Sequence, residues 1–82
     1  MKVMVRVFGR YKDITHKDTI QLNIEQGNTL GDVIDYFVKL YPTTEKDKSR
    51  MMVSKNKIYV SYDTIIDEGD EITLSPPVVS GG

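Results

Sequence analysis

One segment of the chain has helical periodicity, and it limits what the remaining residues can build. Thr29 is a favourable N-cap, and Asp32 three positions later gives a weaker form of the capping box. Pro42 ends the helix, because the residue before a proline is driven out of helical geometry. A single helix can cover only one face of one sheet. The apolar residues at helical spacing are Leu30, Val33, Ile34, Phe37, Val38, Leu40 and Tyr41.

The other apolar residues recur mainly with period two, which is typical of strands. Val3, Val5 and Val7 alternate with other side chains, and the segment 19–24 ("TIQLNI") alternates apolar and polar residues. The simplest connection between these two strands is a hairpin, with residues 9–18 as a loop or wide turn. Three later segments are also predicted as strands, namely 51–55, 58–62 and 71–75.

The connections between the later elements are polar. Residues 43–50 are predicted as a solvated segment with room for one helical turn. Asn56-Lys57 is predicted as a tight turn, and a second turn is expected around Gly69. Pro76-Pro77 cannot donate ladder hydrogen bonds, so the sheet must end there.

This order of elements predicts an α+β domain with a mixed sheet packed on one main helix. If the first and last strands lie together in the centre, the fold is the ubiquitin-like β-grasp. The 82 residues allow one domain, which we place at residues 1–77, followed by a flexible Gly-Gly tail at 78–82.

Composition excludes several classes of function. The net charge of −1 argues against a nucleic-acid binder of the basic type. The chain has no cysteine, so it has neither a disulfide framework nor a thiol nucleophile, and a cytoplasmic location is expected. Lys2 and Arg6 interrupt the opening segment, so neither a signal peptide nor a membrane span is predicted.

No catalytic constellation is evident in the sequence. His16 is the only histidine, and a lone loop histidine is usually a surface residue. No His/Cys cluster has metal-ligand spacing, and "GNTLG" at 27–31 is not a phosphate-binding fingerprint. We therefore expect a chain that is not an enzyme on its own and that binds no metal or cofactor stably.

Two charge blocks remain. The basic block is followed by an acidic block, which is either an ordinary polar surface or a patch beside the tail that steers the tail onto a basic partner. The basic residues are Lys46, Lys48, Arg50, Lys55 and Lys57, and the acidic residues are Asp63, Asp67, Glu68, Asp70 and Glu71.

Over nearly its full length the chain resembles the small, sulfur-carrying subunit of molybdopterin synthase, the MoaD type of the ubiquitin-like β-grasp sulfur carriers. The most specific part is the end of the chain, where a G-D-E turn and a strand precede two prolines and a Gly-Gly pair. The residues that carry the resemblance are Phe8-Gly9, Lys12-Asp13, the helical segment 29–42, Asn56, Gly69-Asp70-Glu71, Pro76-Pro77 and Gly81-Gly82.

The resemblance implies that the C-terminal carboxylate of Gly82 is the working group. An E1-like adenylating enzyme would activate it with ATP and magnesium, and a sulfur donor would then convert it to a thiocarboxylate. Gly81 would be required because no side chain fits the channel that receives the tail. The partner would be the large synthase subunit, in a hetero-tetramer of two small and two large chains, and it would be contacted by Phe8, Pro76, Pro77, Val78, Val79 and Ser80.

Three alternatives remain open from the sequence. The first is a sulfur carrier for thiamin synthesis or tRNA thiolation, although Pro76-Pro77 disfavours the thiamin type. The second is a ubiquitin-like modifier that joins Gly82 to lysines. The third is a plain β-grasp interaction module with a disordered tail.

Overall fold

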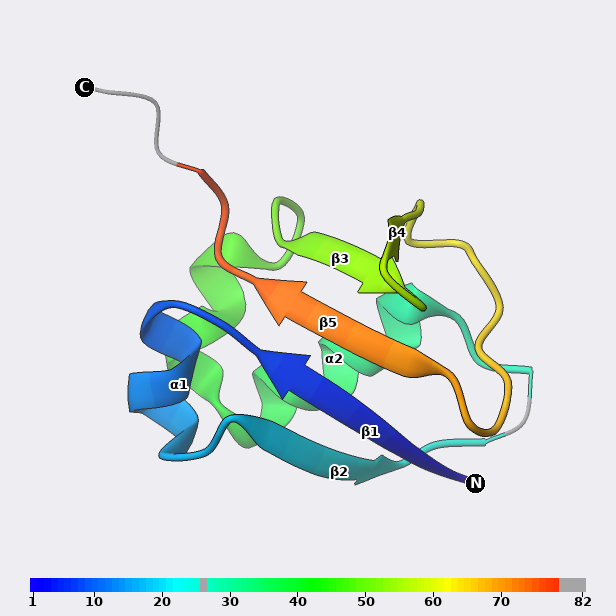
Figure 1. Ribbon diagram of the computed structural model, residues 1–82. Coiled ribbons are helices and arrows are strands. Elements are labelled where there is room, and N and C mark those ends of the chain that lie inside the picture. The colour runs from blue at the N-terminus through cyan, green and yellow to red at the C-terminus, as the bar shows by residue number, and fades with distance from the viewer. Residues whose placement is uncertain (26, 79–82) are drawn as a thin grey trace.

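A five-stranded sheet with the strand order β2-β1-β5-β3-β4 lies over one long helix (Figure 1). The computed structural model describes residues 1–25 and 27–78. In chain order the elements are β1 (Lys2–Val7), α1 (Arg10–Thr15), β2 (Thr19–Asn23), α2 (Leu30–Leu40), the 3-10 helix η1 (Pro42–Asp47), β3 (Met52–Lys55), β4 (Ile58–Tyr59) and β5 (Glu71–Ser75).

The first and last strands are neighbours in the centre of the sheet. β1 pairs with β5 in parallel, with Val5 opposite Ile72, and pairs with β2 in the antiparallel sense. β3 is antiparallel to both β5 and β4. The sheet is therefore mixed, and the predicted ubiquitin-like β-grasp is confirmed.

Helix α2 follows the sequence prediction closely. The Thr29 hydroxyl accepts the Asp32 N–H at 3.3 Å, and the Asp32 carboxylate accepts the Thr29 N–H at 2.8 Å, which completes the capping box. The helix ends at Leu40, and Tyr41 leaves helical geometry before Pro42. Ile34 and Phe37 are fully buried, as the helical spacing predicts.

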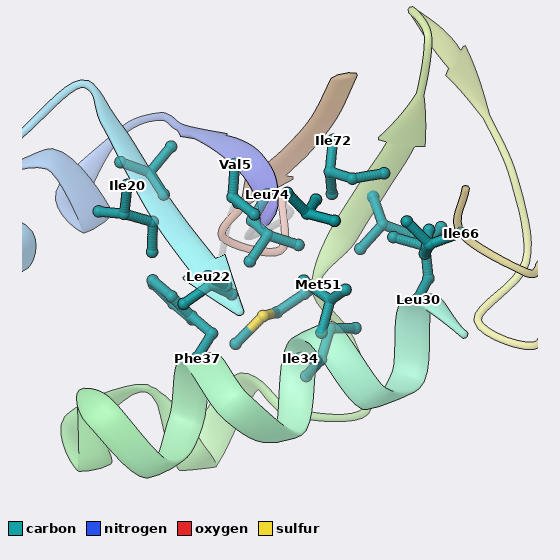
Figure 2. Packing of buried hydrophobic residues seen from close by; sticks show 14 of the residues in the cluster. Val5, Ile20, Leu22, Leu30, Ile34, Phe37, Met51, Ile66, Ile72 and Leu74 are labelled. Atoms are coloured by element: carbon teal, nitrogen blue, oxygen red, sulfur yellow. The ribbon is translucent and has the colours of Figure 1, made fainter. Parts of the chain in front are cut away.

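The core lies between α2 and the inner face of the sheet. Alternate residues of β1, β2 and β5 point toward the helix, which is why period two appears in the sequence. Figure 2 shows the strand residues Val5, Ile20, Leu22, Ile72 and Leu74 meeting the helix residues Leu30, Ile34 and Phe37. Met51 and Ile66, from the connecting segments, belong to the same cluster.

The prediction of a loop or wide turn at 9–18 was wrong for its first half. Residues Arg10–Thr15 form α1, which buries Tyr11 and Thr15 and partly buries Ile14. These three residues are spaced i, i+3 and i+4, so they share one side of a helix. The helix has only six residues, so its periodicity was too short to outweigh the loop signal of Gly9.

The segment 43–50 is less solvated than predicted. Most of it belongs to η1 (Pro42–Asp47), which provides the helical turn allowed for this segment and buries Thr44 and Asp47. The Thr44 hydroxyl donates to the Tyr41 carbonyl at 2.7 Å and so satisfies an acceptor at the end of α2.

The return strand predicted at 58–62 covers only Ile58–Tyr59. The turn before it is confirmed, with Asn56 and Lys57 both at positive φ (53° and 71°), as a two-residue type I′ hairpin requires. After Tyr59 the chain crosses to the start of α2. There the carbonyls of Tyr62 and Thr64 accept the N–H groups of Gly31 and Leu30 at 2.8 and 2.9 Å. These donors of the first helical turn have no partner within the helix.

Candidate functional site

The tail leaves the sheet beside the end of β1. Because β1 and β5 are parallel, both strands end at the same edge of the sheet (Figure 1). Phe8, which follows β1, therefore lies near the residues that follow β5. The Phe8 N–H donates to the Leu74 carbonyl at 3.2 Å. The predicted contact residues Phe8 and Pro76 therefore belong to one surface.

Apolar groups are exposed at this edge. Phe8 is 38% exposed and Val78 is 78% exposed, while Pro76 and Pro77 are partly buried. We call these four residues the tail edge. A partner that covers these residues buries apolar surface that is already exposed, so binding requires no rearrangement of the core.

Gly9 lies directly against the root of the tail. Its backbone has φ 60° and ψ −140°, a combination that side chains strongly disfavour. A Cβ on Gly9 would lie 3.1 Å from Cγ and 3.4 Å from Cδ of Pro76. The absence of a side chain at Gly9 therefore allows the Pro76 ring to approach the backbone.

A cation lies beside the aromatic ring of the tail edge. Lys12 Nζ is 5.6 Å from the centroid of the Phe8 ring and 3.6 Å from a carboxylate oxygen of Asp18. An open groove runs past them, lined also by Arg6, Val7 and Thr19. Asp13, the other member of the basic–acidic pair in the sequence, is exposed.

Helix α1 is held to η1 by a buried carboxylate. The Tyr11 hydroxyl donates to Asp47 Oδ2 at 2.8 Å, and the Arg10 guanidinium donates to the same oxygen. Asp47 is 3% exposed and Tyr11 is fully buried. Burial, then the hydrogen bond to Asp47 and the Asp47 charge, raise the pKa of Tyr11 well above its ordinary value.

The structure gathers four of the predicted site residues and leaves the others outside the described residues. Phe8, Pro76, Pro77 and Val78 form the tail edge. The remaining four, Val79, Ser80, Gly81 and Gly82, lie outside the described part of the chain. Gly9 and Asp47 were not predicted to matter here. Only the glycine gave a signal, since it follows Phe8 in the motif.

Asp70 and Glu71 of the acidic block do not lie beside the tail, which favours the ordinary polar surface over the steering patch. Asp70 and Glu71 are at the start of β5, and the tail leaves at its end, about 13 Å away for strand geometry (Figure 1). Lys55 Nζ lies 3.4 Å from Asp70 and 3.9 Å from Asp67, so the two charge blocks partly neutralise each other. The acidic block and the tail are close in the sequence, but the length of β5 separates them in space.

The acidic turn has a structural role. Burial alone would raise the pKa of Asp70. The Asp67 N–H and the Asn56 amide donate to its carboxylate, and Lys55 bonds to it and adds a positive charge, which together lower that pKa below its ordinary value. Asn56 also accepts the Glu71 N–H at 2.9 Å. These bonds tie the turn around Gly69 to the β3–β4 hairpin.

Within residues 1–25 and 27–78 no group of three His, Cys, Asp or Glu side chains has the geometry to hold a metal ion. His16 is exposed at the C-cap of α1, at φ 59°. Among the same residues, no helix has the length and apolar character needed to cross a membrane.

Comparison with known proteins finds a family and several relatives. The model of the ThiS family matches residues 5–82. The chain is 27% identical over 82 residues to the molybdopterin synthase sulfur carrier subunit of Arabidopsis thaliana, covering 100% of this chain and 84% of that protein. It is 25% identical over 84 residues to the subunit of the same name from Mycobacterium tuberculosis, covering 99% of each.

Two solved structures share the fold. The small archaeal modifier protein 1 of Haloferax volcanii superposes with a TM-score of 0.81 at 22% identity, covering 94% of this chain and 98% of that one. A chain from the complex of subunits 1 and 2 of the molybdopterin-converting factor of Helicobacter pylori superposes with a TM-score of 0.66 at 23% identity, covering 99% and 100%. At these identities the likeness is one of fold.

Proposed function

This chain belongs to the ThiS family, and from that membership we propose that it carries sulfur, as a thiocarboxylate on Gly82, for dithiolene formation in molybdopterin synthesis. Both curated relatives are sulfur carrier subunits of molybdopterin synthase. The single structural observation that carries the proposal is the tail edge. There β5 continues into Pro76, Pro77 and Val78 beside an exposed Phe8.

The proposed chemistry takes place on the carboxylate of Gly82. A free carboxylate is a poor electrophile, so an E1-like adenylating enzyme uses ATP and magnesium to form the acyl adenylate and releases pyrophosphate. A sulfur donor then displaces AMP and leaves a thiocarboxylate. Gly81 and Gly82 let the backbone approach the reacting groups closely. The chain itself supplies the acyl group and the docking surface, and it binds no cofactor stably.

The proposed partner for sulfur delivery is the large subunit of molybdopterin synthase, in an assembly of two small and two large chains. The tail edge and the adjoining sheet face dock, and residues 78–82 enter the partner's site. The Helicobacter pylori neighbour comes from a complex of two such subunits, which supports this partner. The chain is then a non-catalytic subunit that works in the cytoplasm.

The direct test is the intact mass of the chain isolated from its native cell. We expect a species in which one oxygen is replaced by sulfur, and we expect it to disappear when the adenylating enzyme is deleted. If only the free acid is found in cells that make the cofactor, the proposal is wrong. Conjugates to lysine side chains would instead identify a ubiquitin-like modifier.

A second test replaces Gly81 with isoleucine. The β-branched side chain adds atoms where the backbone must approach closely, and it restricts φ and ψ. A misplacement of about 1 Å at a reacting centre costs about 100-fold in rate. We expect Gly81→Ile to keep the native melting temperature and to lose ATP–pyrophosphate exchange with the cognate adenylating enzyme.

The matched control is Tyr59→Ile, which places the same β-branched side chain at an exposed position of β4, outside the tail and the tail edge. It should retain exchange. Native exchange rates in Gly81→Ile would refute the requirement for a tail without side chains.

A further inference from the structure

We propose that Gly9 is a positioning residue for the reactive tail. Its missing side chain lets the Pro76 ring pack on the turn between β1 and α1, and this contact sets the direction in which the tail leaves the sheet. The inference rests on the proposed function, because a defined direction matters only if the tail must reach a reaction site.

The first observation is the close approach itself. A Cβ on Gly9 would be 3.1 Å from Pro76 Cγ, so either the ring or the turn would have to shift. The Phe8 N–H bonds to Leu74 just before the tail begins, which brings the two segments together at this point. Pro76 therefore leaves β5 against a backbone surface that only glycine provides.

The second observation is that this surface is anchored. Arg10 and Tyr11 follow Gly9 immediately, and both donate to the buried carboxylate of Asp47. The Tyr11 ring also packs on Phe37 of α2, with the centroids 5.3 Å apart. The turn is closed by the Lys12 N–H, which donates to the Gly9 carbonyl at 3.0 Å. The Pro76 ring thus rests on a part of the molecule that is fixed to the core.

The third step is how the contact reaches the tail. Pro76 and Pro77 each have φ locked near −65°, so the placement of the first ring restricts the path at least as far as Val78. A shift of the Pro76 ring therefore changes the direction in which the chain leaves the sheet at Val78, and the reactive residues follow from there.

The test is a matched pair of alanine variants. Gly9 and Gly69 both have positive φ (60° and 90°), so both variants strain the backbone. At Gly69 nothing lies within 4 Å of the added Cβ, whereas at Gly9 the Pro76 ring does. We expect both variants to melt at lower temperature. Only Gly9→Ala should lower kcat for adenylation, by about 10- to 100-fold, and the loss should fall mainly on kcat rather than on KM, because the variant removes no side chain of the tail edge.

The result that overturns the inference is a kcat for Gly9→Ala equal to that of Gly69→Ala. If Gly9→Ala does not fold, Pro76→Ala tests the same contact from the other side and should show the same loss of kcat. The two changes should also be coupled. Gly9→Ala should cost less stability in the Pro76→Ala background, since the ring that the Cβ meets is gone.

One readout is independent of activity. In the NMR spectrum of the full chain we expect a nuclear Overhauser contact between the Gly9 α-protons and the ring protons of Pro76, and its absence would also contradict the inference. If the native chain is not adenylated, the proposed function is wrong, and the NMR measurement still tests the contact between Gly9 and Pro76. If the native chain and both glycine variants are adenylated equally, only the role of Gly9 fails.

Discussion

At the scale of single residues, the most consequential side chain outside the core is Asp47. It is charged, 3% exposed and shared by two donors from α1. A buried charge without partners destabilises the folded state. The Asp47 carboxylate therefore favours the packing of α1 that brings its two donors within hydrogen-bond distance. This single acceptor links the start of the chain to the segment after α2.

We predict that Tyr11→Phe destabilises the fold by about 1–3 kcal/mol, the usual contribution of a hydrogen bond to a charged group. Arg10 still bonds to Asp47 in the variant, so the carboxylate keeps one partner. Urea denaturation at neutral pH measures the effect. Tyr59→Phe is the control, since Tyr59 is 73% exposed and its change should leave the midpoint unmoved.

The same tyrosine predicts a dependence on alkaline pH. The pKa of Tyr11 is raised by burial and by Asp47, so the folded state holds its proton more tightly than the unfolded state. The stability from this difference is fully present below the unfolded pKa of about 10 and is lost as pH rises above it. The stability gap between the native chain and Tyr11→Phe should therefore shrink above pH 10. Burial also raises the pKa of Tyr62, so the variant keeps part of the alkaline transition. A gap that stays constant to higher pH would contradict the assignment.

The Asp47 interaction could not be predicted from the sequence. Asp47 lies in a run of polar residues, and nothing local distinguishes it from its exposed neighbours Lys46 and Lys48. Its role depends on a partner 36 positions away. The position of Phe8 and Pro76 at the ends of neighbouring strands follows from the strand order, whereas their role in partner contact stays a prediction.

At the scale of elements, the long helix and the paired strands could be predicted because their signals are local. The period, the cap and the final proline of α2 all lie within its own segment. Helix α1 was missed because six residues give too few turns to show a period. Strand β4 stops early because the following backbone carbonyls bond to the first turn of α2, which no local pattern reveals.

We predict that Phe37→Ala loses about 3–5 kcal/mol, as is typical for truncating a buried Phe. Its ring is fully buried and packs between Tyr11 and Tyr41. A domain of this size has roughly 5–15 kcal/mol of stability in total, so the variant should melt far below the native chain. Leu40→Ala, on the same helix but 59% exposed, is the control and should melt close to the native temperature. Equal melting curves for Phe37→Ala and the native chain would mean that this face of α2 does not pack as observed.

At the scale of the whole molecule, charge and apolar surface are separated along β5. The acidic turn lies at the start of the strand and is tied to β3 and β4, while the tail edge lies at its end. The sequence places the acidic residues and the tail close together, and only the length of the strand separates them in space. This is why the sequence alone left both readings of the acidic block open.

We predict that deletion of residues 78–82 leaves the melting temperature unchanged but weakens capture of the large synthase subunit. Val78 is 78% exposed, so the described part of this segment contributes little to the core. Pull-down with the native and shortened chains measures the difference. Ile58→Ser is the control, because Ile58 is exposed and its ladder neighbours lie at the opposite end of β5. Equal recovery by the shortened chain would show that the tail adds nothing to docking.

The parallel pairing of β1 with β5 also has a consequence for biosynthesis. The strand that completes the centre of the sheet is the last of the five to be synthesised, so one edge of β1 stays unpaired until Glu71–Ser75 is available. Contacts of such sequence separation are slow to form and arise late. The step that closes the sheet is therefore the same step that places Pro76 on its support. A chain in which β5 has not yet paired therefore lacks the contact between Gly9 and Pro76, so the activation proposed for Gly82 would require a completed sheet.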